Sequence, residues 1–230
     1  MHDILKDKKV IFFDIGYTLD YPATGDWMFM LGFQRIAGER LKQYAPEQIR
    51  KARAAGMDYL SKNHLIPDED AELDRFLHYY RILSDELKLD LTEEELRISA
   101  EDRVRNMDNY VAYPDARKVL QELSGTHILG IISDTWPSID RQLRHLNLTE
   151  FFSFFTYSFE LGVFKPDRRM YLDALEKCGH KAEETVFIDD GPANLAGAAE
   201  LGITPILIAA NPASDVDTPF MKIHTLSELL

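Results

Sequence analysis

Residues 10–13 form a short run, VIFF, that is apolar at every position and ends at the carboxylate of Asp14. A continuously apolar strand is typical of a parallel sheet covered on both faces, because neither side of such a strand meets water. Open α/β sheets bind their ligands at the carboxyl ends of the strands, which is where Asp14 would lie. Alternatively, Asp14 only caps the turn that follows, and the rest of the chain has to separate these two interpretations.

Helical and strand patterns alternate in the second half of the chain. We predict helices over residues 115–124, 137–146, 167–178 and 192–201, strands over 127–132, 185–188 and 203–209, a turn and a strand within 151–159, and a last short strand near the end. Gly179 and Gly202 would stop two of these helices. This alternation predicts a Rossmann-like α/β fold, a doubly wound parallel sheet with helices on both faces.

A different pattern fills residues 26–109, where charged and apolar side chains recur at helical spacing and glycine is scarce. We predict helices over 26–44, 46–62, 69–88 and 92–106. Pro46 suits the first turn of its helix, and Thr92 with Glu95 forms a capping box. The expected organisation is an α/β core domain built from residues 1–20 and 111–230, interrupted by an all-helical domain over 21–110, here named the helical insert.

The composition argues against several classes of protein. Acidic residues outnumber basic ones, 39 to 26, for a net charge of −13, and no basic stripe is present to neutralise a nucleic acid. No apolar run approaches the roughly 20 residues that cross a bilayer, and the N-terminus lacks the pattern of a signal peptide. Cys178 is the single cysteine. We expect a cytoplasmic monomer or homodimer without a nucleic-acid or membrane partner.

Polar side chains follow three of the predicted strands: Asp14, Ser133 and the pair Asp189–Asp190. Because parallel strands end at one edge of a sheet, these groups should meet there despite their separation in the sequence. Lys165, in the segment FKPD before a predicted helix, adds an ammonium group. A carboxylate nucleophile, a hydroxyl, an ammonium and paired acids suit phosphoryl transfer to a carboxylate, with acidic oxygens holding Mg²⁺.

These motifs resemble those of the haloacid dehalogenase-like hydrolases, in the subgroup with a helical cap inserted after the first strand. DIGYTL is similar to the first motif of the family, the serine of IISDT to the second, the lysine of GVFKPD to the third and IDDGPAN to the fourth. The motifs occur in the order of the family, and the helical insert falls where that cap belongs. The resemblance therefore covers essentially the whole chain.

The resemblance assigns a nucleophile and a metal site. Asp14 would attack phosphorus and form an aspartyl-phosphate that water then hydrolyses. Asp14, Asp190 and Asp189 would hold Mg²⁺ with the backbone carbonyl of Gly16, although one of the paired aspartates could instead cap the next helix. Asn194 matches a position that orients the metal-site loop, and a plain helical amide is the alternative.

Two further residues would act on the phosphoryl group by the same resemblance. Ser133 would donate a hydrogen bond to it, and Lys165 would pair with both the nucleophile and the phosphate. The implied activity is Mg²⁺-dependent hydrolysis of a small phosphorylated metabolite.

Gly16 departs from the pattern of the family, whose phosphatases usually carry a second aspartate there as general acid and base. Such proton transfer is typically worth about 10²–10⁴-fold in rate. Acyl phosphates and phenolic esters, whose leaving groups need no proton, would be affected least. Five residues are candidate substitutes, although a solvated or packed side chain is the more common state for each: Asp20, His64, His78, Tyr79 and Tyr80. The run over residues 27–30, WMFM, likewise favours packing over substrate contact.

Two other functions stay open. A non-catalytic member that binds a phosphorylated ligand or a protein partner would explain Gly16, but it would not need the nucleophile. A metal-independent 2-haloacid dehalogenase would use an aspartate to attack carbon. Asp189 and Asp190 count against it, because paired acids without a metal would repel an anionic substrate.

Overall fold

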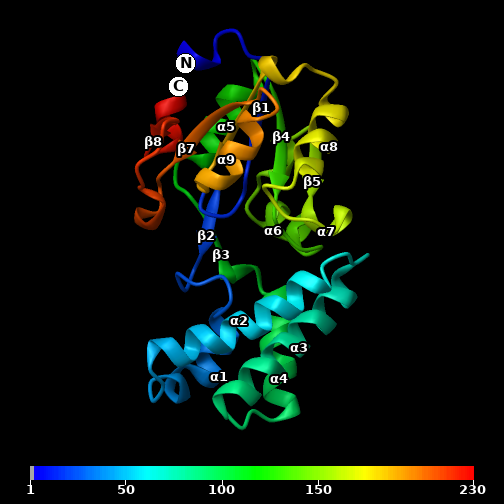
Figure 1. The fold of residues 1–230 in the computed structure, drawn as a ribbon, viewed down its shortest axis with the longest axis vertical. Helices are drawn as coiled ribbons and strands as arrows, with labels where there is room; N and C mark the ends of the chain where they lie inside the picture. Colours follow the sequence, from blue (N-terminus) through cyan, green and yellow to red (C-terminus); the bar gives the residue numbers. More distant parts are fainter. Residues whose placement is uncertain (1–2) are drawn as a thin grey trace.

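A six-stranded sheet forms the centre of the α/β part of the molecule in the computed structural model, which describes residues 3–230 (Figure 1). The strand order is β5-β4-β1-β6-β7-β8, and every neighbouring pair is parallel. The strands are β1 (Val10–Phe13), β4 (Ile128–Ser133), β5 (Phe154–Tyr157), β6 (Thr185–Asp189), β7 (Thr204–Ile208) and β8 (Met221–Ile223). The predicted α/β fold with a parallel, Rossmann-like sheet is confirmed.

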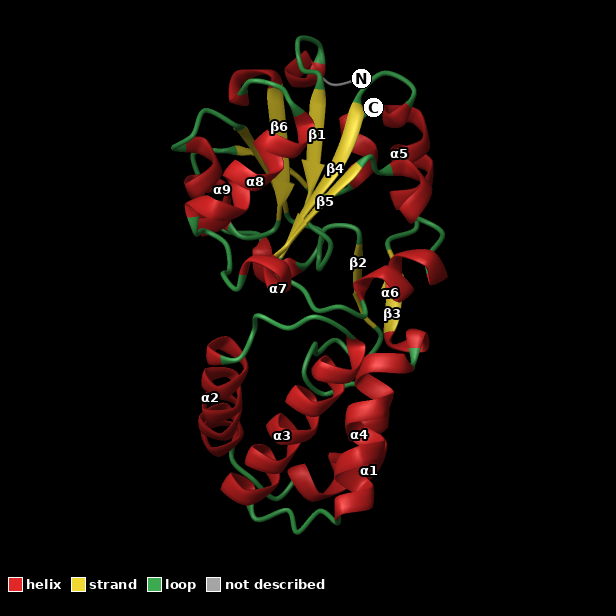
Figure 2. Ribbon diagram, turned by 90° about the vertical axis from the view of Figure 1, so that its right-hand side faces the viewer, coloured by secondary structure: helices red, strands yellow, loops and turns green. Residues whose placement is uncertain are grey.

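Helices cover both faces of this sheet (Figure 2). Helices α8 (Arg168–Cys178) and α9 (Pro192–Ala199) lie on one face and α5 (Ala116–Ser124) on the other. Ile11 and Phe13 belong to the apolar cluster on the α5 side, whereas Val10 and Phe12 pack with the helices of the opposite side. Strand β1 is therefore apolar at all four positions because both of its faces are buried.

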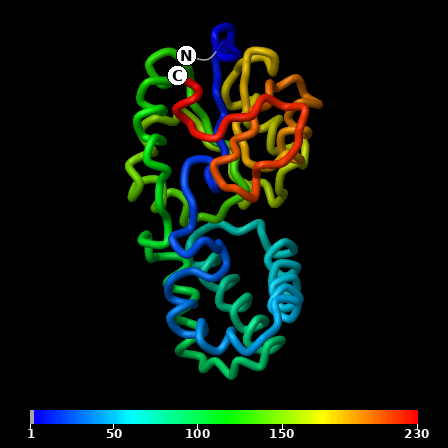
Figure 3. The backbone as a smooth tube through the Cα atoms, turned by 90° about the vertical axis from the view of Figure 1, so that its left-hand side faces the viewer, coloured from blue at the N-terminus to red at the C-terminus, as the bar shows by residue number. Residues whose placement is uncertain are grey.

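The helical insert lies beyond the carboxyl edge of the sheet, at the far end of the molecule from both chain termini (Figures 1 and 3). Its helices are α1 (Leu31–Leu41), α2 (Pro46–Lys62), α3 (Glu69–Leu87) and α4 (Glu93–Arg105). They pack around a cluster of their own that includes Phe33, Phe76, Tyr79, Tyr80 and Leu83. The division into domains at residues 20 and 110 stays a prediction.

Two short strands that the sequence analysis did not predict carry the chain into and out of the insert. Strands β2 (Asp20–Pro22) and β3 (Tyr110–Ala112) pair antiparallel, with Asp20 opposite Ala112. Three residues are too few for a periodic pattern, so nothing in the sequence distinguished these strands from loops.

The prediction of a helix from residue 26 is wrong, because α1 begins at Leu31. One carboxylate oxygen of Asp26 accepts hydrogen bonds from the backbone N–H groups of Met28 (2.9 Å) and Phe29 (3.2 Å), which holds residues 26–30 in a non-helical turn. The N–H of Leu31 donates to the side-chain oxygen of Asn109 at 3.0 Å. A cap from a distant residue thus sets the start of the helix.

The remaining elements agree with the predicted ranges to within two residues at most ends. Helix α6 (Ile139–His145) and the single turn α7 (Ser158–Leu161) complete the core, and short 3₁₀ segments occur at Asp3–Leu5, Met107–Asn109, Thr149–Phe151, Ala182–Glu184, Pro212–Ser214 and Leu226–Leu229. Among residues 3–230, no helix combines the length and the apolar character that crossing a bilayer requires.

Candidate active site

A cavity of about 340 Å³ lies at the carboxyl edge of the sheet. The core lines it with residues that include Asp14, Gly16, Ser133, Asp134, Gln142, Lys165, Asp190 and Asn194. The helical insert and the chain entering and leaving it add Trp27, Met28, Arg103 and Tyr110. The structure therefore brings the predicted site residues together, except that Asp189 lies behind the wall of the cavity and not in it. A volume of this size suits a small metabolite.

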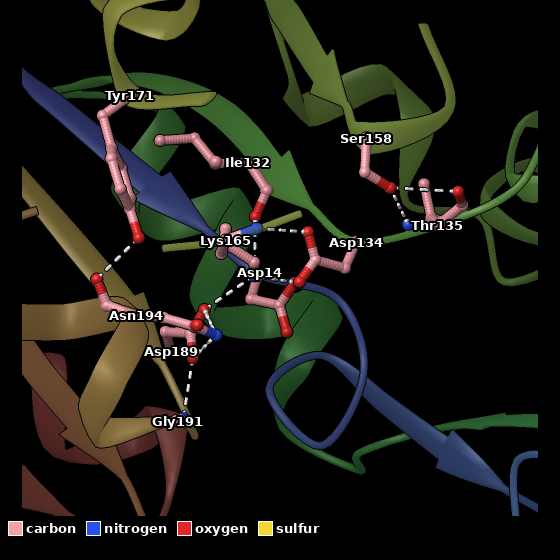
Figure 4. Close-up of polar contacts among 10 residues, drawn as sticks. All are labelled: Asp14, Ile132, Asp134, Thr135, Ser158, Lys165, Tyr171, Asp189, Gly191 and Asn194. Atoms are coloured by element: carbon pink, nitrogen blue, oxygen red, sulfur yellow. Dashed lines mark hydrogen bonds and ion pairs between the residues drawn. The ribbon is translucent and has the colours of Figure 1, made fainter. Parts of the chain in front are cut away.

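Lys165 is the centre of the polar network (Figure 4). Its Nζ lies 2.8 Å from Oδ1 of Asp14 and 2.7 Å from Oδ2 of Asp189, and it donates to the carbonyl of Ile132 at 3.2 Å. Burial disfavours its charge, but the carboxylates of Asp14, Asp189 and Asp134 outweigh this effect and raise the pKa of the ammonium. Lys165 therefore stays protonated and holds the Asp14 carboxylate in place.

Asp189 is fully buried, and both of its oxygens accept hydrogen bonds within the protein. Oδ1 accepts from the N–H of Gly191 at 2.6 Å and from Nδ2 of Asn194 at 3.0 Å, while Oδ2 accepts from Lys165. These bonds fix the loop after β6 and orient the side chain of Asn194, whose backbone carbonyl accepts from the hydroxyl of Tyr171 at 2.7 Å (Figure 4). Asp189 thus positions Lys165, Gly191 and Asn194 and does not itself line the cavity.

Asp14, Asp189 and Asp190 offer carboxylate oxygens that all lie within 4.8 Å of one another. Burial and the negative charges of Asp14 and Asp189 raise the pKa of Asp190 to about 7, although Ser214 donates to its Oδ2 at 2.8 Å. One lysine cannot neutralise three clustered carboxylates, so the site has a surplus of negative charge. Oxygen donors with this surplus fit a hard divalent cation such as Mg²⁺.

Ser133 ends β4, and the loop after it is held by two sets of bonds (Figure 4). Oδ1 of Asp134 accepts from the N–H of Lys165 at 2.9 Å, and burial raises the pKa of Asp134 to about 6. The N–H of Thr135 donates to Oγ of Ser158 at 2.8 Å. Asp134 was not predicted as a site residue, although its place directly after Ser133 at the end of a strand was a usable signal.

Trp27 lies against Gly16, the position where the family usually has its second aspartate. A β-carbon at position 16 would lie 3.0 Å from Cζ2 of the Trp27 indole. Trp27 also packs edge-on against Tyr17, with ring centres 5.4 Å apart, and Tyr17 adopts a left-handed backbone conformation with φ of 56°. The sequence of residues 27–30, WMFM, favours packing over substrate contact. Packing alone does not describe these residues, since Trp27 and Met28 also line the cavity.

The candidate substitutes for the missing proton donor do not line the cavity. Asp20 is fully buried and accepts a hydrogen bond from Gln142, and burial raises its pKa to about 8. Nε2 of His64 lies 2.7 Å from Oγ of Ser158, and burial lowers the pKa of His64 to about 4. His78 packs on the ring of Tyr59, and the rings of Tyr79 and Tyr80 are buried in the cluster of the insert.

Most of the chain, including every residue that lines the cavity, matches a known protein family. Residues 8–202 match the model of the haloacid dehalogenase-like hydrolases. The chain belongs to this family. The position of helices α1–α4, after β1 and before β4, is compatible with the helical-cap subgroup of haloacid dehalogenase-like hydrolases.

A phosphatase and a dehalogenase are among the proteins whose sequences resemble that of this hydrolase. Over 121 residues it is 31% identical to the glyceraldehyde 3-phosphate phosphatase of Methanocaldococcus jannaschii. The aligned region covers 51% of this chain and 53% of the relative. Over 123 residues it is 28% identical to the (S)-2-haloacid dehalogenase 4A of Burkholderia cepacia, again 51% and 53% of the two chains. The match thus spans about half the length of each curated relative.

The fold of this haloacid dehalogenase-like hydrolase also matches solved structures over nearly the whole chain. The crystal structure of the L-2-haloacid dehalogenase PA0810 superposes with a TM-score of 0.67, covering 96% of this chain and 97% of the other at 20% identity. At this level of identity the likeness concerns the fold alone.

Proposed function

We propose that this hydrolase is a Mg²⁺-dependent phosphatase that acts on a small phosphorylated metabolite through an aspartyl-phosphate on Asp14. The main support is the buried Lys165, whose ammonium lies 2.8 Å from Asp14 beside a cluster of three carboxylates. This arrangement holds the nucleophilic carboxylate in place and leaves a surplus of negative charge that suits a cation. A purely structural ion pair would not need the additional acids.

The chain's own residues account for most of the first step. A carboxylate oxygen of Asp14 attacks phosphorus, and the leaving-group oxygen departs with the electron pair of the broken P–O bond. The ammonium of Lys165 and the hydroxyl of Ser133 stabilise the equatorial oxygens of the phosphoryl group. Asp14, Asp190 and the carbonyl of Gly16 would hold Mg²⁺, which supplies charge neutralisation of the phosphate.

The leaving group should be one that departs without a proton. Gly16 provides no carboxyl group, and Trp27 fills the space beside it. Acyl and aryl phosphates should therefore react faster than alkyl phosphates, by a factor comparable to the loss of a general acid, about 10²–10⁴-fold.

The test is the release of inorganic phosphate from acetyl phosphate and p-nitrophenyl phosphate by the full chain. We expect release with Mg²⁺, loss of release with EDTA, and a loss of at least about 10³-fold in Asp14→Asn, which lacks the nucleophile. Asp217→Asn, an exposed aspartate in the loop before β8, is the matched control and should keep full activity. The proposal is wrong if wild-type protein with Mg²⁺ turns over neither compound.

A 2-haloacid dehalogenase is the second candidate, favoured by the similarity to the Burkholderia enzyme. The clustered carboxylates count against it, because they would repel a haloacid anion unless a cation neutralised them. Halide release from 2-chloropropionate that persists in EDTA would favour this function over the phosphatase.

We also propose that residues 21–110 act as a cap over the active site. We further propose that the protein is cytoplasmic and is a monomer or a homodimer.

A further inference from the structure

Arg103, on α4, brings a positive charge from the helical insert to the wall of the cavity. The residue is 7% exposed. The guanidinium carbon lies 4.6 Å from the ring centre of Phe76 and 5.9 Å from that of Tyr110. Flanking aromatic rings thus hold a buried cation at the cavity that also contains Asp14.

The hydrogen-bonding capacity of this guanidinium is largely unused. Nη1 donates to the hydroxyl of Tyr110, which in turn donates to the backbone carbonyl of Arg103 at 3.2 Å. Nε is buried without a partner, and within residues 3–230 no carboxylate lies close enough to form an ion pair with Arg103. A guanidinium has five N–H donors, and a buried one without a paired anion is costly.

Glu72 is the acidic group that acts on Arg103 from α3, but its oxygens are already committed. They accept from the N–H of Ser138 at 2.7 Å and from the hydroxyl of Ser138 at 2.8 Å. Glu72 therefore interacts with Arg103 only through long-range electrostatic attraction and accepts no hydrogen bond from the N–H donors of the guanidinium. The other cation of the cavity, Lys165, is by contrast already paired with two carboxylates, those of Asp14 and Asp189.

We propose that Arg103 is a specificity-determining residue that binds a second oxyanion, a carboxylate or a phosphate, on the organic part of a phosphorylated substrate. This inference rests on the proposed phosphatase function. The planar guanidinium fork matches the two oxygens of either group. In a chain with a net charge of −13, a substrate with two anionic groups needs a local cation for each of them.

The size and walls of the cavity agree with this assignment. A volume of about 340 Å³ holds a short carbon skeleton that carries two charged ends. Trp27, Tyr110 and Trp136 contribute aromatic walls, and such apolar surroundings strengthen the attraction between the guanidinium and an anion.

A series of three-carbon phosphates tests the proposal with a matched change at one end. Glycerol 3-phosphate ends in a neutral hydroxymethyl group, 3-phosphoglycerate in a carboxylate and glycerol 1,3-bisphosphate in a second phosphate. All three are alkyl phosphates and should turn over slowly, so the comparison concerns their relative kcat/KM. We expect wild type to favour one of the two compounds that carry a second anionic group over glycerol 3-phosphate. Arg103→Gln should reduce this preference by about 10- to 100-fold, mainly through KM, and Arg103→Lys should reduce it less.

The matched control is Arg105→Gln, two residues further along the same helix, where the side chain is half-exposed and pairs with Asp70 at 3.6 Å. This variant should keep the wild-type preference. Of the two compounds with a second anionic group, the one that is preferred more strongly identifies that group as a carboxylate or a phosphate. An equal kcat/KM for all three compounds in wild type, or an unchanged preference in Arg103→Gln, would overturn the assignment.

A binding measurement separates this inference from the proposed function. The two tryptophans of the chain, Trp27 and Trp136, both line the cavity, so intrinsic fluorescence reports on its contents. In Asp14→Asn, which should not turn over, 3-phosphoglycerate or the bisphosphate should bind more tightly than glycerol 3-phosphate, and Arg103→Gln should abolish the difference. Phosphate release that persists in Asp14→Asn would contradict the proposed function alone. If Arg103→Gln fails to fold, Arg103→Lys carries the same comparison.

Discussion

Gly16 is the residue at which this chain departs most clearly from the chemistry of its family, and its neighbour Trp27 shows that the departure is structural as well as chemical. A side chain at position 16 would begin 3.0 Å from the indole ring. The indole of Trp27 therefore fills the space that a carboxyl group at position 16 would need. Substitutions at these two positions should not be independent, because residues in contact couple energetically.

We expect Gly16→Asp alone to overpack the site, lowering the free energy of unfolding by about 1–3 kcal/mol without a gain in alkyl phosphate hydrolysis. In the double variant Gly16→Asp with Trp27→Ala the new carboxyl group has room, and hydrolysis of glycerol 3-phosphate should rise by up to about 10²-fold. Urea unfolding and phosphate release measure the two effects, with Trp27→Ala alone as control. Equal gains in the single and double variants would show that Trp27 does not occlude the position.

At the scale of elements, the helical insert depends on a close approach of α2 to α3 at a glycine. A β-carbon at Gly56 would lie 2.5 Å from Cε2 of Tyr79, whereas one at Gly38 in α1 would meet no heavy atom within 4 Å. Helix propensity favours alanine over glycine equally in both helices. Packing should therefore decide the sign of the same substitution at the two sites.

Gly56→Ala should destabilise the protein by about 1–3 kcal/mol, since the Tyr79 ring would have to move within a filled cluster. Gly38→Ala should instead stabilise α1 by about 0.5–1 kcal/mol through lower backbone entropy in the unfolded chain. Equilibrium unfolding in urea, followed by far-UV circular dichroism, compares the two. A loss of stability in both variants would mean that the space around Gly38 is not free in solution.

Local signals account for the elements that the sequence predicted well. Helix α2 starts at Pro46 and ends at Lys62 as expected, because proline suits a first helical turn and carries its own signal. The start of α1 depends on Asn109, 78 residues further along the chain, whose side-chain oxygen accepts from the N–H of Leu31 at 3.0 Å. Such a contact exists only in the folded insert, so no local pattern could have revealed it.

The site shows the same division. Asp14, Ser133 and Asp190 could be predicted because the ends of parallel strands share one edge, whatever the details of packing. Trp27 and Arg103 could not, because their place at the cavity depends on how the insert sits on the core. Asp189 was predicted as a ligand of the metal, but the sequence could not show that both of its oxygens accept hydrogen bonds from the protein.

For the molecule as a whole, buried carboxyl groups dominate the dependence of stability on pH. Burial raises the pKa of Asp20 to about 8, of Glu72 to about 7, of Asp190 to about 7 and of Asp134 to about 6, from ordinary values of 3.8, 4.5, 3.8 and 3.8. The folded state therefore binds more protons than the unfolded state between about pH 4 and 8. Over that window the free energy of unfolding of the metal-free protein falls as the pH rises.

Mg²⁺ should reverse this trend, because it requires the ionised carboxylates that are otherwise unfavourable. We expect the Tm of metal-free protein to be lower at about pH 8 than at about pH 5.5, and saturating Mg²⁺ to raise it mainly at the higher pH. Asp190→Asn should lose this Mg²⁺-dependent shift, and Asp217→Asn should keep it. A shift of the same size at both pH values would contradict the link between metal binding and ionisation of the acidic cluster.

The ribbon formed by β2 and β3 has a mechanical consequence. Both connections between the sheet and the insert run through this one pair of strands, bonded to each other with Asp20 opposite Ala112. The two connections therefore bend together, as a single hinge and not as two independent tethers. A rotation of the insert about this hinge would move Trp27 and Arg103 together. The space beside Gly16 and the binding of the second anionic group of a substrate would therefore change in a single motion.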